Sequence, residues 1–200
     1  MIEEAVAAIR AGEPVVLPTD TVYGLCADPE RESAAREVSR LKGRDERRPL
    51  ALLARDVEML LERVPELDHG VLGALLPGPF TLVLPNPARR YPWLSGARPE
   101  TIGVRVPELT GSAAKVLEEV GAVIATSANL HGGPDPGRLD EVPAEIRRAC
   151  AVLVDGGELP GRPSTVLDLT GPEPTVVREG AVPAAEALEA LAAAGSSRPE

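Results

Sequence analysis

The sequence predicts a single-domain α/β fold in which short buried strands alternate with amphipathic helices. The chain has 200 residues, of which 44% are hydrophobic and 26% are charged, a size and composition typical of one globular domain. Apolar runs alternate with segments of helical periodicity, and neither an internal repeat nor a linker to a second hydrophobic segment interrupts them. We therefore expect one domain over residues 1–195 and a frayed tail over residues 196–200.

Short apolar runs predict the strands. Each run is only a few residues long and is bounded by turn residues or by a helical period. The runs cover residues 15–17, 50–54, 80–84, 101–106, 122–125, 152–154, 165–167 and 175–177. Their order in a sheet does not follow from the sequence.

Helical periodicity predicts seven helices between these strands. The helices cover residues 3–11, 32–41, 57–61, 71–76, 113–120, 142–150 and a last helix from residue 183. Gly12 and Gly43 are expected to end the first two, because glycine adopts the left-handed conformation of a helix C-terminus. The irregular, Pro-rich residues 85–99 are predicted to form a loop that covers a ligand.

Charge and aromatic content argue against a general RNA-binding protein. The chain has 31 acidic and 21 basic residues, a net charge of -10, and only 2% aromatic residues. A net negative charge opposes nonspecific attraction to a polyphosphate backbone, and so few aromatic rings cannot build a base-stacking platform. An anionic ligand would need a local basic pocket.

Several familiar catalytic and metal-binding patterns are absent from the sequence. There is no GxxxxGK[ST] phosphate loop, no GxGxxG after a strand and no HExxH. Cys26 and Cys150 are too far apart to predict a zinc or redox motif, so we expect buried thiols in a reducing compartment. The N-terminus is acidic, and no apolar run approaches the roughly 20 residues that cross a bilayer. These observations predict a cytoplasmic protein without a membrane segment.

Polar clusters follow or lie within the predicted strands. Thr19 to Thr21 follow the first strand, Arg105 lies in the strand 101–106, and Thr126 to Asn129 follow the strand 122–125. Ligands of α/β sheets bind where strand ends converge. The candidate cations for such a crevice are Lys42, Arg44, Arg47, Arg48, Arg105 and Arg178. Guanidinium groups match phosphate or carboxylate oxygens, so the crevice should prefer a small polyanion.

Each of these residues also has a structural interpretation. Lys42 and Arg44 follow a predicted helix, where surface cations commonly complement the helix dipole. Thr19 and Ser127 have the residue types of turns and caps. Only their joint order along the chain discriminates between a ligand site and purely structural roles for these residues.

Six short segments occur in a fixed order. They are residues 18–25 (PTDTVYGL), 42–44 (KGR), 77–81 (PGPFT), 103–107 (GVRVP), 127–129 (SAN) and 164–166 (STV). In this order they resemble the YrdC-like family of L-threonylcarbamoyladenylate synthases, over nearly the whole chain from the first helix to residue 180. The resemblance implies a twisted open mixed sheet with flanking helices, in the short single-domain form of the family.

The resemblance also implies a reaction and its residues. A nucleotidyltransferase of this family converts L-threonine, bicarbonate and ATP, with Mg²⁺, to threonylcarbamoyl-AMP and pyrophosphate, for N6-threonylcarbamoyladenosine in tRNA. Its product passes to a downstream threonylcarbamoyl-transferase complex. By position, threonine would be held by Thr21, Arg105, Ser127 and Ser164, and ATP by Arg44, Thr101, Asn129, Gly137 and Arg178. Lys42 and Arg44 would be catalytic, and no protein side chains would form a metal site.

Two departures from the family pattern put contacts in doubt. Arg48 stands where an Asn commonly meets ATP, and Leu53 stands where some members have His.

Two alternative functions remain: a module that processes carbamoyl-adenylate in longer carbamoyltransferases, and an RNA-binding factor of translation or ribosome assembly. For the second, Arg47, Arg48, Arg89 and Arg90 would form a basic rim that contacts tRNA.

Overall fold

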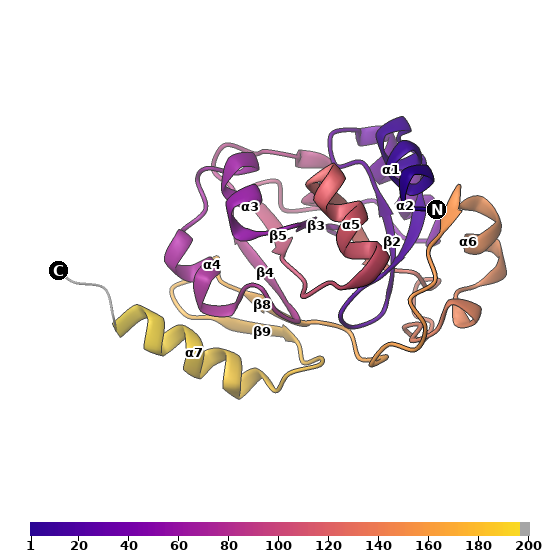
Figure 1. Cartoon of the computed structure of the whole chain (residues 1–200). Helices are drawn as coiled ribbons and strands as arrows, with labels where there is room; N and C mark the ends of the chain where they lie inside the picture. Colours follow the sequence, from indigo (N-terminus) through magenta and orange to yellow (C-terminus); the bar gives the residue numbers. More distant parts are fainter. Residues whose placement is uncertain (197–200) are drawn as a thin grey trace.

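The computed structural model describes residues 1–196 and, within its last helix, the side chains as far as residue 193. Nine strands in this part of the chain form one mixed sheet, in the order β7-β1-β2-β6-β3-β5-β4-β8-β9 (Figure 1). The strands are β1 (Val15–Pro18), β2 (Tyr23–Ala27), β3 (Ala51–Ala54), β4 (Phe80–Pro85), β5 (Thr101–Arg105), β6 (Ala122–Ser127), β7 (Val152–Leu153), β8 (Thr165–Asp168) and β9 (Thr175–Arg178). The predicted α/β class and open mixed sheet are confirmed.

Seven α-helices accompany the sheet in the described residues. They are α1 (Ile2–Ala11), α2 (Glu32–Leu41), α3 (Val57–Arg63), α4 (His69–Leu75), α5 (Gly111–Val120), α6 (Ala144–Ala149) and α7 (Ala184–Ser196), with 3-10 turns η1 (Pro92–Leu94) and η2 (Leu139–Glu141). Ser196 therefore belongs to α7 and not to a tail, and the rest of the expected tail, 197–200, lies outside the described residues. No helix among residues 1–196 has the length and apolar character needed to span a membrane.

Local sequence signals account for most helix ends. Gly12 ends α1 at φ 86°, and its N–H donates to the Ile9 carbonyl at 2.8 Å. Asp56 and Asp68 cap α3 and α4 by accepting backbone N–H groups, which is why α4 starts two residues before the predicted residue 71. Pro143 precedes α6, so the predicted helix 142–150 is shorter than expected.

Strand β2 was not predicted from the sequence. It pairs antiparallel with β1 on one side and with β6 on the other, and all of its residues are buried. Its sequence, YGLCA, includes a glycine and no alternation of polar and apolar residues. Pairing on both edges, which is a tertiary effect, overrides this weak local propensity.

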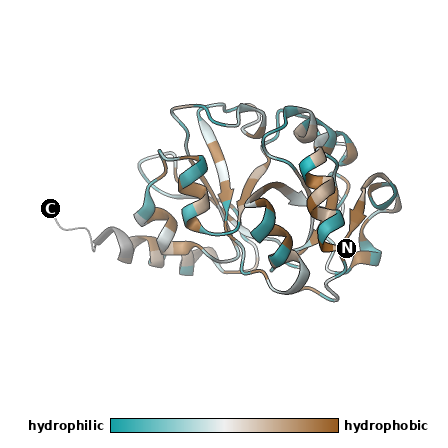
Figure 2. Cartoon of the chain, turned by 45° about the horizontal axis from the view of Figure 1, so that its top comes forward, coloured by the Kyte–Doolittle hydropathy of each residue, from teal (hydrophilic) through white to brown (hydrophobic). Residues whose placement is uncertain are grey.

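Neighbouring residues of the strands enter two different cores. Val16, Leu25 and Leu52 pack in a large cluster that includes residues of α2, α3, α4 and α7. Val15, Cys26 and Leu53 pack in a second cluster with α1 and α5. Because side chains alternate across a strand, these clusters lie on opposite faces of the sheet. Figure 2 shows brown strands between helices that carry brown and teal stripes.

The sheet ends in an irregular edge strand. Strand β9 pairs antiparallel with β8, but Val166 lies opposite Arg178 while Leu167 lies opposite Val176. Val177 is therefore an extra residue, a β-bulge. Beyond it, α7, yellow in Figure 1, runs beside α4.

Candidate functional site

A cavity of about 710 Å³ opens on the sheet face that α1 and α5 cover only in part. Its floor comes from six adjacent strands, β2, β6, β3, β5, β4 and β8; β3, β5, β4 and β8 contribute alternate residues, and the end of β6 contributes the consecutive residues 125–127. Four floor positions carry little or no side chain: Gly24, Ala51, Gly103 and Ala125. The cavity exists because these residues leave space above the sheet, and its volume suits a small-molecule ligand.

The cavity has the local positive charge that the acidic chain requires for an anionic ligand. The basic side chains that line it are Lys42, Arg44, Arg47, Arg48, Arg98, Arg105 and Arg178. Asp135 and Asp168 are the acidic residues among the described lining. The predicted ligand-covering loop contributes Ser95, Ala97 and Arg98 to this wall.

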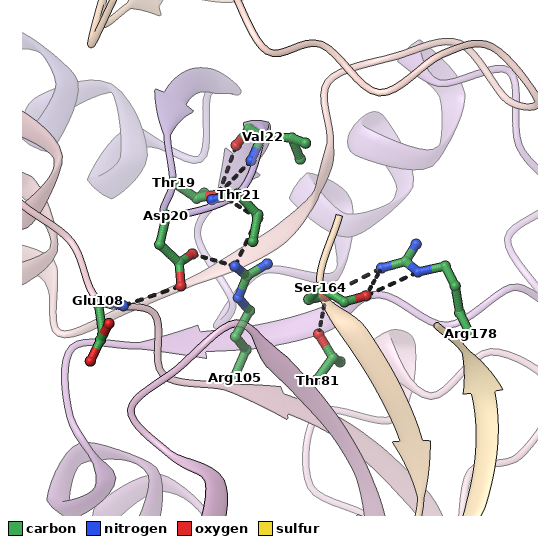
Figure 3. A network of polar contacts seen from close by, with 9 residues as sticks. All are labelled: Thr19, Asp20, Thr21, Val22, Thr81, Arg105, Glu108, Ser164 and Arg178. Atoms are coloured by element: carbon green, nitrogen blue, oxygen red, sulfur yellow. Dashed lines mark hydrogen bonds and ion pairs between the residues drawn. The ribbon is translucent and has the colours of Figure 1, made fainter. Parts of the chain in front are cut away.

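The turn between β1 and β2 is organised by the Thr19 hydroxyl (Figure 3). Thr19 Oγ1 accepts the N–H groups of Thr21 and Val22, both at 3.2 Å, and donates to the Val22 carbonyl at 2.7 Å. The Thr21 hydroxyl lies 3.0 Å from it. This turn therefore presents Thr21 and Asp20 in fixed positions.

Arg105, at the end of β5, is held by this turn. Its Nη2 donates to Thr21 Oγ1 at 2.8 Å and to the carboxylate of Asp20, which also accepts the Glu108 N–H at 3.3 Å (Figure 3). Arg105 is 7% exposed, so burial lowers its pKa while Asp20 opposes this effect. Its Nε is buried without a partner in the described chain.

Ser164 joins two further predicted residues. Its hydroxyl lies 2.8 Å from Thr81 Oγ1, and its carbonyl accepts hydrogen bonds from Arg178 Nε and Nη2 at 3.1 and 2.8 Å (Figure 3). A predicted threonine contact and a predicted ATP contact are thus adjacent. Thr81 was not assigned a role from the sequence, although it lies in the PGPFT segment.

Lys42 is not the exposed helix-end cation of the dipole interpretation. It is 4% exposed, and its Nζ donates to the Ser127 carbonyl at 2.5 Å, to Ser127 Oγ at 3.2 Å, and to the carbonyl and side-chain oxygens of Asn129. Burial, with the nearby Arg44 charge, lowers the pKa of Lys42 to about 8. The ammonium group therefore holds the Ser-x-Asn pair in place.

Arg44 faces the cavity from the segment after α2. Its Nη1 donates to Thr126 Oγ1 at 3.3 Å and its Nη2 to the Pro49 carbonyl, while its Nε is buried without a partner in the described residues. Burial lowers the pKa of this guanidinium. The hydroxyl of Ser95, which also lines the cavity, is likewise buried and unpartnered there; sequence analysis had given Ser95 no role.

The structure brings most of the predicted site residues to one cavity. The residues that line it are Lys42, Arg44, Thr101, Arg105, Ser127, Asn129, Ser164 and Arg178. Thr21 reaches the site through Arg105. Gly137 does not line the cavity, and its N–H donates to the Glu141 carboxylate at 2.8 Å. Arg48 and Leu53, the two departures from the family pattern, both line the wall.

Neither cysteine lies in this cavity. Burial raises the pKa of both Cys26 and Cys150 to about 12. Among residues 1–196, no group of three or more His, Cys, Asp and Glu side chains is placed to hold a metal ion.

The fold and the cavity define an α/β protein with a cationic ligand site on one face of its sheet. A family model for Sua5, YciO and YrdC proteins, described as "Telomere recombination", matches residues 7–180. The chain belongs to the Sua5/YciO/YrdC family.

Individual relatives agree with this assignment. A Halorhodospira halophila protein named threonylcarbamoyl-AMP synthase is 37% identical over 183 residues, 90% of each chain. The Pyrococcus abyssi Sua5 structure complexed with L-threonine has a TM-score of 0.86 and 33% identity, over 94% of this chain and 56% of that one. Escherichia coli YciO has a TM-score of 0.82 and 28% identity, over 94% and 92%.

Proposed function

We propose that this protein is a nucleotidyltransferase that makes threonylcarbamoyl-AMP and pyrophosphate from L-threonine, bicarbonate and ATP, for N6-threonylcarbamoyladenosine in tRNA. The observation that carries the proposal is a single cavity in which hydroxyl groups and Arg105 occur together with a group of cations. Family relatives named threonylcarbamoyl-AMP synthase support the same activity and do not favour either alternative function.

We infer that the two substrates bind near opposite ends of β5. Arg105 and Thr101 lie on the same face, about 13 Å apart at the strand rise of roughly 3.3 Å per residue, and Gly103 lies between them. We assign the threonine carboxylate to Arg105, because this residue lines the cavity and a guanidinium group matches a carboxylate. ATP would lie toward Thr101, with its phosphates near Arg44 and Arg178.

The chemistry requires little from the side chains beyond positioning. The amine of threonine attacks bicarbonate or carbon dioxide and forms a carbamate; from bicarbonate, one water leaves. A carbamate oxygen then attacks the α-phosphorus of ATP, and the bond to the β-phosphate oxygen breaks and releases pyrophosphate. The cations of the cavity align these groups and neutralise charge that moves onto pyrophosphate.

Mg²⁺ fits this site as a companion of ATP and not as an ion held by a protein cluster. Mg²⁺ usually keeps several waters and binds through one or two carboxylates and substrate phosphates. Asp135 in the cavity wall is a carboxylate of that kind. When bound, the ion would add to the charge neutralisation on the phosphates.

A direct assay tests the proposal. The protein is incubated with ATP, Mg²⁺, bicarbonate and L-threonine, and pyrophosphate and the adenylate product are quantified. We expect product only when threonine and bicarbonate are both present. Pyrophosphate release that does not depend on threonine would overturn the assignment.

Contact with tRNA is a separate proposal. Of the expected basic rim, Arg47 pairs with Asp45 at 2.7 Å and Arg90 with Glu66 at 2.8 Å, which reduces its net charge. Arg48 and Arg89 remain as candidates for a weak contact, tested by duplex RNA affinity across a salt series. A cytoplasmic location and delivery of the adenylate to a transferase complex follow from the proposed function.

A further inference from the structure

Asp135 is a carboxylate in a wall built mainly of cations. It lines the cavity, and no hydrogen bond or ion pair joins its side chain to the rest of the described chain. It shares this wall with Lys42 and Arg178, whose pKa values are lowered by burial, and its negative charge partly opposes that lowering. A cavity for a polyphosphate therefore contains one carboxylate that protein contacts leave available.

The backbone on both sides of Asp135 is fixed. Pro134 and Pro136 flank it, and their rings restrict φ. The Gly133 carbonyl accepts a hydrogen bond from Asn129 Nδ2 at 2.6 Å, and the Pro136 carbonyl accepts the Tyr23 N–H at 2.9 Å. The same Asn129 is bound by Lys42. Asp135 is thus positioned by the polar framework that forms the site.

The second carboxylate of the wall is different. Asp168 accepts hydrogen bonds from Arg98 Nη1 at 2.6 Å and from Thr170. Its charge is already balanced by the guanidinium. Of the acidic residues in the described lining, Asp135 is therefore the one whose oxygens are available to a ligand.

An available carboxylate beside phosphates is unfavourable unless a cation lies between them. At close range the repulsion between like charges weakens binding of a bare polyphosphate. A divalent cation between the carboxylate and the phosphates makes their interaction favourable, because the cation is attracted to the oxygens of both groups.

We propose that Asp135 faces the Mg²⁺ ion carried by ATP and is the protein carboxylate that makes nucleotide binding dependent on this ion. The inference rests on the proposed function, because it requires ATP in this cavity. Asp135 would act as a ligand of the ion or of one of its waters.

Asp135→Asn tests the inference, because the amide keeps the shape and removes the charge. ATP affinity of wild type and variant is measured by isothermal titration, once with excess Mg²⁺ and once with EDTA. We expect MgATP binding to weaken by about tenfold, the lower end of what groups that orient a metal contribute. Metal-free ATP should bind a few-fold more tightly, because a like charge has gone.

Asp140→Asn is the matched control. Asp140 has the same charge in the same part of the chain, but it pairs with Arg138 at 3.4 Å and does not line the cavity. The Asp140→Asn variant should bind MgATP and metal-free ATP with wild-type affinity. As a readout independent of affinity, the electron paramagnetic resonance spectrum of Mn²⁺ bound with ATP should change in Asp135→Asn and not in Asp140→Asn.

The outcomes separate this inference from the proposed function. If wild type binds MgATP and Asp135→Asn strengthens MgATP binding or leaves it unchanged, Asp135 does not serve the Mg²⁺ ion and the inference is wrong. If wild type binds no ATP in either condition, the proposed function fails and the inference fails with it.

Discussion

The two faces of β5 and its neighbour β4 are made from alternate residues of the same strands, yet they have opposite characters. On one face, Ile102, Val104 and Leu82 are fully buried in a core of aliphatic side chains beneath helices. On the other, Gly103 and Thr101 form the floor of a cavity, and Arg105 is buried beside Asp20. The comparison shows that stability and ligand binding are assigned to neighbouring residues of one strand, so single substitutions should separate them.

Arg105→Ala should have the largest effect, because it acts on both properties. It leaves the Asp20 carboxylate, whose side chain is only 10% exposed, without its guanidinium partner, a loss that costs about 3 to 5 kcal/mol of stability for a buried pair. Threonine affinity should also fall while ATP affinity, measured alone, is retained. Urea denaturation and titration of each ligand measure the two effects. The double variant Asp20→Asn/Arg105→Met should recover stability but not threonine binding. If stability is not recovered, the unpaired carboxylate is not the cause of the loss.

Ile102→Ala tests the covered face. Ile102 is 0% exposed, and the cavity left by such a truncation costs about 2 to 5 kcal/mol. The activity of the folded fraction should remain at the wild-type level, because the side chain points away from the ligand cavity. Chemical denaturation together with kcat/KM at low temperature checks this. A loss of activity that exceeds the loss of folded protein would contradict the separation of the faces.

Gly103→Val is the counterpart on the open face. A Cβ at Gly103 meets only the Leu50 carbonyl at 3.7 Å and the Ala51 Cα at 3.9 Å, which are ordinary contacts. The remaining methyl groups would enter the cavity and displace the substrates, so we expect activity to fall by about a hundredfold. The free energy of unfolding should stay within about 1 kcal/mol of wild type. An active variant would place the substrates elsewhere.

Lys42 gives the smallest and most specific test. Its pKa is about 8 in the folded protein against an ordinary value of about 10.4, so between these pH values the unfolded chain binds a proton that the folded chain does not. Stability that depends on Lys42 therefore rises with pH in this window. The difference in unfolding free energy between wild type and Lys42→Met should grow in favour of wild type by about 1 to 2 kcal/mol from pH 7.5 to 9.5. Parallel curves would contradict the lowered pKa.

Much of the fold and site was predictable because the signals are local. Apolar runs located β1 and β3, glycine located the end of α1, and the ordered motifs contain Lys42, Arg44, Arg105, Ser127, Asn129 and Ser164, which line the cavity. Strand β2 was missed because its five residues become a strand only between β1 and β6. The sequence also could not show that Lys42 binds Ser127 and Asn129, since that contact depends on which strands are neighbours.

The roles of Asp20 and Asp135 illustrate a second limit. Asp20 lies in a polar cluster that the sequence singled out, but its residue type does not reveal an arginine partner, and nothing in the spacing of Asp135 distinguishes it from a surface carboxylate. Only the structure shows that Asp20 is paired with Arg105 and that Asp135 lies in a wall of cations.

The extra residue in β9 changes what one strand offers to a ligand. Regular strands present every second side chain to a given face, but here the consecutive residues Val177 and Arg178 both line the cavity. An apolar surface and a guanidinium group are thereby placed side by side, suited to a ligand whose flat ring adjoins its anionic part. Deleting one residue of the bulge would restore regular alternation and remove one member of this pair. The length of β9, and not only its composition, therefore determines which of its side chains reach the cavity.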